Sequence, residues 1–290
     1  MRLLNQDREA RPRSAVEVAD ELRRVIEPDP DVAVVGLTLL GVNARGCKEY
    51  RNEKDGTVLG YIRPAEFTMG SSEFEEAPPH QVALDDYLIA KSPVTNVQYR
   101  RFCQATGHPE PRQMNEGEGH SHYFWDPRYD HHPVLGVTWD DAKAYCDRAD
   151  LELPTEAQWE HAARGRDQRK YPWGDEEPAE DRANYKTGGP TKYTQPVDSH
   201  PKGESPFGIL DMAGNVWEWC ADWYDVAAYA RCDDGERNPR GPTDPHTYRV
   251  VRGGSWNFQS GYLRAAQRNW GLPTQRYQHV GFRATRSRLR

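Results

Sequence analysis

Apolar residues occur along this chain in many short runs, separated by polar and turn-forming residues. Runs of this kind lie at 61–62, 67–69, 81–84 and 87–90, and their length predicts short β-strands. Three longer segments, 96–106, 138–146 and 155–164, read as helices. Thr138 and Thr155 stand at the N-cap positions of the second and third. The pattern therefore predicts several short strands combined with a few helices.

The beginning of the chain has a different pattern. Residues 1–27 are helical in pattern, with Ser14 and Glu17 spaced as in a capping box. A Pro-Asp-Pro-Asp stretch then opens the segment 28–59, which we interpret as a linker with a β-branched joining strand at 32–42. The main domain is expected to cover 60–290.

The C-terminal part has two strand-like pieces, 248–251 and 280–283, which we expect to share one small antiparallel sheet. About thirty residues without helical or strand periodicity separate them. This stretch mixes large amphipathic rings with amide side chains, a composition typical of an adaptable contact surface. The alternative is an ordinary solvated loop with a few core aromatics.

Composition narrows the class of protein. Only 36% of the residues are apolar, whereas Trp, Tyr, Gly and Pro are abundant, which predicts a loop-rich fold held by aromatic packing. The net charge of −7 argues against a general nucleic-acid coat, although the arginines from Arg283 to Arg290 leave a polyanion contact open as an alternative to a solvated tail. No apolar run is long enough to span a bilayer. Five cysteines without CxxC spacing predict reduced thiols in a cytoplasmic protein.

Several ordered motifs resemble the formylglycine-generating enzyme (sulfatase-modifying factor) superfamily. They are Arg-Gly-Gly-Ser-Trp at 252–256, Gly-Phe-Arg at 281–283, Leu-Pro-Thr-Glu-Ala-Gln-Trp-Glu at 153–160, Tyr-Pro-Trp-Gly at 171–174 and Gly-Asn-Val-Trp-Glu-Trp at 214–219. The match covers roughly residues 60 to 285. It implies a C-type-lectin-like α+β fold. Separately, residues 3–12 are similar to the end of a protein-kinase domain, which suggests a kinase domain in the full-length gene product; a chance helix is the alternative.

The resemblance implies a structural calcium site. Its ligands would be the side chains of Asn215 and Glu218 with the carbonyl of Val216, oxygen donors of the kind calcium prefers. The alternative is that Asn215 and Glu218 only brace the turn. A second calcium site would fall on Asn184 and Tyr185, but its downstream carboxylate has no clear equivalent among residues 186–193.

The sequence also indicates whether the copper chemistry of this superfamily is present. Formylglycine-generating enzymes bind copper through two cysteines just after the Gly-Gly-Ser motif, and no cysteine follows Cys232 in this chain. Because a phenyl or phenol ring cannot replace a thiolate as a soft-metal ligand, we expect no copper and no enzyme activity. The iron of the related sulfoxide synthases is held by an added helical domain that this chain lacks. A catalytic member of the superfamily with altered chemistry is the alternative.

The C-terminal frame resembles most closely the variable proteins of diversity-generating retroelements, in which targeted mutagenesis rewrites codons of the final motif. This likeness implies a ligand-binding protein whose partner is an unknown protein or other macromolecule, with no nucleic acid and no membrane span. Trp256, Leu263, Arg264, Arg268 and Phe282 would form the frame. The variable region would cover about 256–283, and its diversified positions would be Asn257, Phe258, Gln259, Tyr262, Ala265, Gln267, Asn269, Trp270, Gly271, Thr274, Gln275, Tyr277, Gln278 and His279.

Overall fold

The computed structural model describes residues 35–111, 123–188 and 193–287. From Gly36 onward they belong to one compact unit. The predicted N-terminal helix and its kinase-like residues, 1–27, lie outside the described residues. None of the helices in the described ranges is long and apolar enough to cross a membrane.

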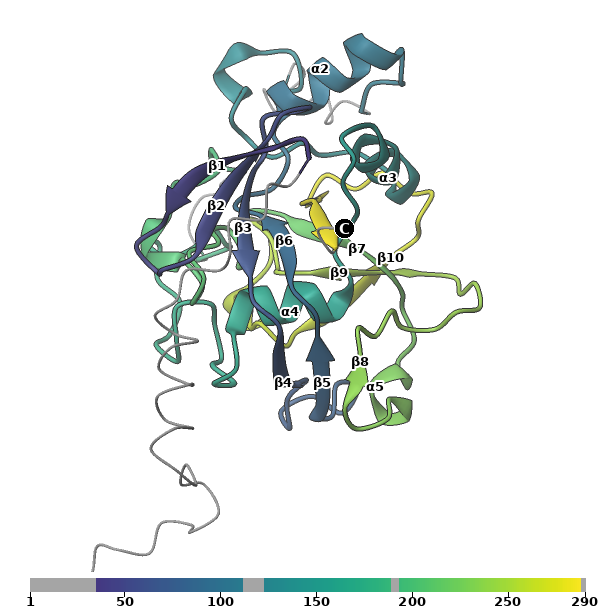
Figure 1. The fold of residues 1–290 in the computed structure, drawn as a ribbon. Coiled ribbons are helices and arrows are strands. Elements are labelled where there is room, and N and C mark those ends of the chain that lie inside the picture. Colours follow the sequence, from purple (N-terminus) through teal and green to yellow (C-terminus); the bar gives the residue numbers. More distant parts are fainter. Residues whose placement is uncertain (1–34, 112–122, 189–192, 288–290) are drawn as a thin grey trace, which may run out of the picture. The chain divides into compact units, whose positions relative to one another are not determined.

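A five-stranded antiparallel sheet opens the domain (Figure 1). Its strands are β1 (Leu37–Val42), β2 (Lys48–Asn52), β3 (Val58–Ile62), β6 (Tyr87–Ala90) and β12 (Thr285–Ser287), and they lie side by side in the order β1-β2-β3-β6-β12. The segment expected to be a linker and joining strand, 28–59, therefore supplies two full strands of the sheet. The reason is burial: Tyr50 pairs with Leu59 across β2 and β3, and both side chains are in the core.

A four-stranded sheet holds the C-terminal strands. It contains β7 (Trp217–Trp223), β9 (Arg249–Arg252), β10 (Arg268–Gly271) and β11 (Val280–Gly281), in the order β10-β9-β7-β11. The two strand pieces predicted near 248–251 and 280–283 thus belong to one sheet. The sheet is mixed rather than antiparallel, because β11 pairs in parallel with β7 instead of pairing with β9.

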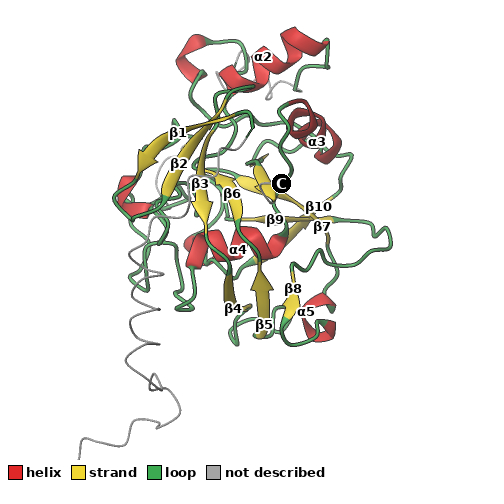
Figure 2. Ribbon diagram, viewed as in Figure 1, coloured by secondary structure: helices red, strands yellow, loops and turns green. Residues whose placement is uncertain are grey.

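The third sheet has three strands, β4 (Ala65–Met69), β5 (His80–Leu84) and β8 (Glu236–Arg237). The predicted helices are present as α2 (Asn96–Thr106), α3 (Trp139–Arg148) and α4 (Glu156–Arg164). Each begins with a capping box built on a threonine: Thr95, Thr138 and Thr155. The short helix α5 (Ala228–Arg231) and 3₁₀ turns at Pro127–Tyr129, Pro201–Gly203 and Ser260–Leu263 occupy the loops. Small sheets with few helices confirm the α+β class (Figure 2).

Helix α4 lies between two of the sheets, in contact with β4 and β5 on one side and β7 and β9 on the other. All nine of its residues are buried. A helix that is buried all round is normally apolar, yet α4 carries Glu156, Glu160, His161 and Arg164. Buried charges of this kind need partners, and the C-terminal strands provide them. All five cysteines are described, and none forms a disulfide.

Candidate functional site

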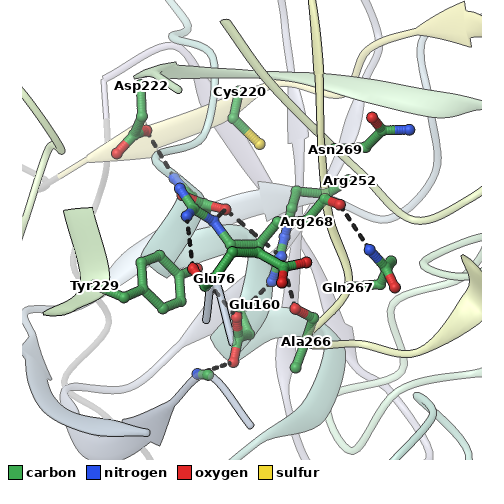
Figure 3. A network of polar contacts seen from close by, with 12 residues as sticks. Glu76, Glu160, Cys220, Asp222, Tyr229, Arg252, Ala266, Gln267, Arg268 and Asn269 are labelled. Carbon is green, nitrogen blue, oxygen red and sulfur yellow. Dashed lines mark hydrogen bonds and ion pairs between the residues drawn. The ribbon is translucent and has the colours of Figure 1, made fainter. Parts of the chain in front are cut away.

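Two glutamates of α4 form ion pairs with arginines near the C-terminus; Figure 3 labels Glu160, Arg252 and Arg268. Arg268 donates two parallel hydrogen bonds to the carboxylate of Glu156, 2.8 Å from Nε to Oε1 and 2.9 Å from Nη2 to Oε2. Arg252 pairs with Glu160, whose other oxygen accepts from Arg164 at 3.0 Å. Burial raises the pKa of Glu156, but the charges of Arg268 and Arg252 outweigh it and leave that pKa below its ordinary value. Glu156 is therefore ionised, and the two arginine–glutamate pairs hold the C-terminal strands against α4.

A third buried pair joins β7 to the Gly-Phe-Arg motif. Arg283 donates from Nε to Glu218 Oε2 at 2.6 Å and from Nη2 to Oε1 at 2.7 Å. Trp159 of α4 donates its indole N–H to Glu218 Oε2 at 2.7 Å. Neither charged side chain is exposed. Bidentate pairing in a dry interior fixes both side chains, so Glu218 has a structural role in this fold.

This geometry tests the expected calcium site. A calcium ligand set needs oxygen atoms that are free to face the ion. Both oxygens of Glu218 are already occupied, and its charge is balanced by Arg283. The amide of Asn215 is likewise engaged, since its Oδ1 accepts from Gln195 N–H at 3.0 Å and its Nδ2 donates to Gln195 O at 3.1 Å. Asn215 and Glu218 therefore fit the bracing alternative, and the trio with Val216 does not fit a calcium ion.

The second expected site differs in one respect. The amide of Asn184 donates from Nδ2 to Tyr193 O at 2.8 Å, while its buried Oδ1 has no hydrogen-bond partner. An unpartnered buried oxygen is the kind of atom a hard cation takes. No group of three or more His, Cys, Asp or Glu side chains within the described ranges is arranged to hold a metal ion. Asn184 and Tyr185 thus supply oxygen atoms but no counter-charge.

Four rings of the predicted variable positions form a continuous line. Tyr262 lies 5.1 Å from Phe258, Phe258 lies 5.3 Å from His279, and His279 lies 5.6 Å from Tyr277, measured between ring centroids. We call these four residues the ring line. Burial lowers the pKa of His279, so its imidazole is neutral near pH 7.

The ring line rests on the core. Phe258 contacts Trp217 and Tyr277 contacts Trp219, at centroid distances of 5.5 and 6.0 Å. Both tryptophans belong to β7 and have no exposed surface. Because their positions are fixed by the sheet, the ring line is supported from below by a rigid element.

Most of the predicted variable positions, the ring line included, fall into two groups by exposure. Gln259, Tyr262, Trp270, Thr274 and Gln275 are exposed, with Trp270 at 46% and Tyr262 at 39%. Trp270 stands apart from the ring line and packs on Tyr248, 4.1 Å between centroids. The second group is half-buried and comprises Asn257, Phe258, Gln267, Asn269, Tyr277, Gln278 and His279.

Two predicted positions do not belong to any contact surface. Ala265 is fully buried in the core cluster around Trp159. Gly271 is buried too, and a Cβ atom there would lie 2.6 Å from Cη2 of Trp219 and 3.0 Å from Cε2 of Tyr277. Spacing in the sequence includes both in the variable region, but packing leaves no room for a larger side chain at either.

The frame also needs one correction. Trp256, Leu263, Arg268 and Phe282 are buried as expected. Arg264 is not: its side chain is 31% exposed and makes an ion pair of 3.3 Å with Glu73, itself half exposed. In the stretch 263–268, which reads Leu-Arg-Ala-Ala-Gln-Arg, Arg268 is the anchoring arginine and Arg264 lies at the edge.

We expect the change Gly271→Ala to lower the free energy of unfolding by about 1–3 kcal/mol, because the added methyl group must displace the fully buried Trp219. Urea denaturation of the variant and the parent measures this. Gly261→Ala is the matched control, since it lies in the same C-terminal region, has an ordinary φ and has open space around its Cβ position. Equal stability of the two variants would show that the strand has room for a side chain at 271.

A cavity of about 510 Å³ was not foreseen from the sequence. It lies beside the N-terminus of α4, the end of β7 and α5, and Asp222 and Trp223 face it. Its other walls come from segments as far apart as Met69 and His246. No local motif marks such a cavity, because only the folded chain brings these segments together.

Comparison with known proteins identifies relatives of this chain. The model of the sulfatase-modifying factor enzyme 1-like domain matches residues 46–288. A serine/threonine-protein kinase pkn1 of Chlamydia pneumoniae is 36% identical over 243 residues, which are 80% of this chain and 38% of the kinase-named protein. The chain thus spans well under half the length of that relative. Hercynine oxygenase of Mycobacterium tuberculosis is 34% identical over 241 residues, 72% of this chain and 54% of the oxygenase.

A fuller match is found with the formylglycine-generating enzyme of Thermomonospora curvata. It is 33% identical over 256 residues, covering 72% of this chain and 84% of the enzyme. Among solved structures, PvdO from Pseudomonas aeruginosa has a TM-score of 0.70 at 24% identity, covering 83% of this chain and 98% of that one. Treponema denticola variable protein 1 has a TM-score of 0.63 at 24% identity, with coverage of 80% and 95%. At this identity the two structures establish the fold.

These relatives correct one expectation. The missing copper-binding cysteines led to the prediction that the chain is not an enzyme, and that prediction is wrong: relatives at 33–34% identity are named formylglycine-generating enzyme and hercynine oxygenase. The loss of one pair of metal ligands excludes one chemistry and says nothing of others on the same frame. From the matched residues and these relatives, the chain belongs to the family of sulfatase-modifying factor enzyme 1-like domains.

Proposed function

We propose that the C-terminal face of this domain recognises a macromolecular partner through the ring line and the exposed positions around it. The observation that carries the proposal is the row of four contiguous rings over two buried tryptophans. Partly exposed rings on a rigid support offer contact area at little entropic cost, as in antibody paratopes. Glutamines 259, 275 and 278 beside them in the sequence supply adaptable hydrogen bonds.

The proposal extends to diversification of this face, as in the variable proteins of diversity-generating retroelements. Exposed positions such as Tyr262, Trp270 and Thr274 have room for other side chains, whereas packing leaves no room for a larger side chain at Ala265 and Gly271. Sequencing this gene in closely related strains should therefore find changes concentrated at the exposed positions. Changes spread evenly over the domain, or concentrated at Ala265 and Gly271, would rule out diversification of this face.

Binding is tested by selecting ligands from a displayed library of folded proteins against the full chain. We expect Tyr262→Ala to weaken binding of the selected ligands by about tenfold or more, as loss of a central aromatic contact does, with a melting temperature close to that of the parent. Trp125→Ala is the matched control, because Trp125 is exposed to the same extent, 39%, but lies outside the face. Equal loss in both variants, or no loss with Tyr262→Ala, would contradict the proposal.

Catalysis is the second candidate, supported by the identity of 33% with the formylglycine-generating enzyme of Thermomonospora curvata. Its chemistry would differ from copper–thiolate oxidation, since no cysteine follows Cys232. The same selected ligands separate the two candidates. A catalytic face changes the mass of a bound ligand during incubation, and a recognition face releases it unchanged. The kinase-named relatives further support a place for this domain beside a kinase domain in a longer protein.

A further inference from the structure

The cavity beside α4 is built from residues that do not belong to the C-terminal face. Its volume of about 510 Å³ is in the range of small-molecule sites. Apolar surface on its walls comes from Met69, Trp223 and Tyr229. Buried carbon surface next to polar groups is the usual composition of a site for a small organic ligand.

The charged groups facing this cavity are mostly acidic. Glu156, Asp222, Asp225, Glu236 and Asp244 line it, against one arginine, Arg231. Arg231 pairs with Asp225, and Glu156 is held by Arg268 from behind. The other three acids have no ion pair with any residue that the structure describes. The cavity therefore has an excess of negative charge.

Asp222 is the decisive group, because it is buried and has no ion pair within the described ranges. Its residue surface is 4% exposed. Oδ2 accepts a hydrogen bond of 2.7 Å from the backbone N–H of Glu156, and Oδ1 accepts from no other side chain in the described part of the chain. A buried carboxylate without a direct cationic partner is costly, and the nearby charge of Arg268 offsets only part of this cost. Burial, and after it the charge of Glu156, raise the pKa of Asp222 to about 7.

Two kinds of cation could supply the missing charge. A metal ion would need several ligands gathered around it, and no such group of three or more His, Cys, Asp or Glu exists in the described part of the chain. An organic cation needs one buried counter-ion and apolar or aromatic surface for its methylene chain, and Asp222 with Met69, Trp223 and Tyr229 offers both.

We propose that this cavity binds an organic cation, an ammonium or guanidinium group on an aliphatic chain, with Asp222 as its buried counter-ion. Glu236 and Asp244 add negative charge to the cavity lining and attract the cation from solution. The cation has two sources with the same chemistry, a free amine or the side chain of a lysine or arginine in a protein.

The test is calorimetric titration of the full chain at pH 8 with agmatine, and with N-butylurea as a neutral compound of similar shape. We expect one agmatine site per chain and no binding of the urea. Asp222→Asn keeps an oxygen to accept from Glu156 N–H but removes the charge, and should weaken agmatine by about tenfold or more. Asp147→Asn, at an exposed acid paired with Lys143, is the control and should leave the affinity unchanged.

A second variant keeps the test independent of the buried position. Glu236 is exposed, so Glu236→Gln changes no buried group. We expect this variant to bind agmatine a few-fold more weakly than the parent, and added salt should remove the difference. Equal binding of agmatine and N-butylurea, undiminished binding by Asp222→Asn, or no agmatine binding at millimolar concentration would each overturn the proposal. A capped Gly-Arg-Gly peptide identifies the source: tighter binding than agmatine indicates a protein side chain, and weaker binding a free amine.

Discussion

Replacing Arg283 by methionine is expected to lower the free energy of unfolding by about 3–5 kcal/mol, which is the cost of leaving a buried charge without its partner. The guanidinium makes two bonds to Glu218 and donates to the carbonyl oxygens of Ala90 and Leu210 at 3.0 and 2.9 Å. Methionine fills similar space but, among the described residues, leaves Glu218 with the Trp159 indole as its one strong donor. Denaturant titration followed by tryptophan fluorescence measures the loss.

Arg128→Met is the matched control for this change. Its side chain is 78% exposed and pairs with Asp126 at the surface, so we expect a change within about 1 kcal/mol. The double variant Arg283→Met/Glu218→Gln should recover part of the lost stability, because the uncompensated charge is removed with its partner. A single variant as stable as Arg128→Met would mean that Glu218 finds another cation or a proton.

The second large effect is a difference in stability between variants of two nearby arginines, Arg268 and Arg264. Arg268→Met is expected to cost about 3–5 kcal/mol, since this fully buried side chain holds Glu156 and donates to the carbonyls of Glu76 and Asp225 at 3.1 and 3.2 Å. Arg264→Met, four residues earlier, is expected to cost less than about 1 kcal/mol, because its pair with Glu73 is half exposed.

Thermal and denaturant unfolding of both variants measure this difference. Both variants lose one positive charge, so a difference in stability between them does not come from net charge. If Arg264→Met lowered the free energy of unfolding as much as Arg268→Met, Arg264 would contribute to stability like the buried arginine. Its placement at the edge of the domain would then be wrong.

Much of the local structure could be predicted from the sequence because its causes are local. The helices at 138–146 and 155–164 were predicted with Thr138 and Thr155 as their N-caps, and each threonine forms a capping box in the structure. The strand pieces at 248–251 and 280–283 followed from short β-branched or aromatic runs. The family followed from ordered motifs, which the match over residues 46–288 confirms.

The missed features depend on contacts between distant residues. Glu218 reads as a metal ligand until Arg283, 65 positions later, is found against it. Gly271 reads as a variable loop position until Trp219 is found behind it. The parallel pairing of β11 with β7 has no local signal either, since a two-residue strand carries no information about its direction. The cavity around Asp222 is invisible for the same reason.

The pairing of early carboxylates with late arginines has a consequence for how the protein is made. Synthesis is vectorial, so Glu156, Glu160 and Glu218 leave the ribosome before Arg252, Arg268 and Arg283. Until the last of these has emerged, α4 cannot be enclosed without trapping unpaired charge, and the nascent chain must keep that helix in water. The domain therefore cannot close from its N-terminus forward: its core is completed only after Arg283 has left the exit tunnel.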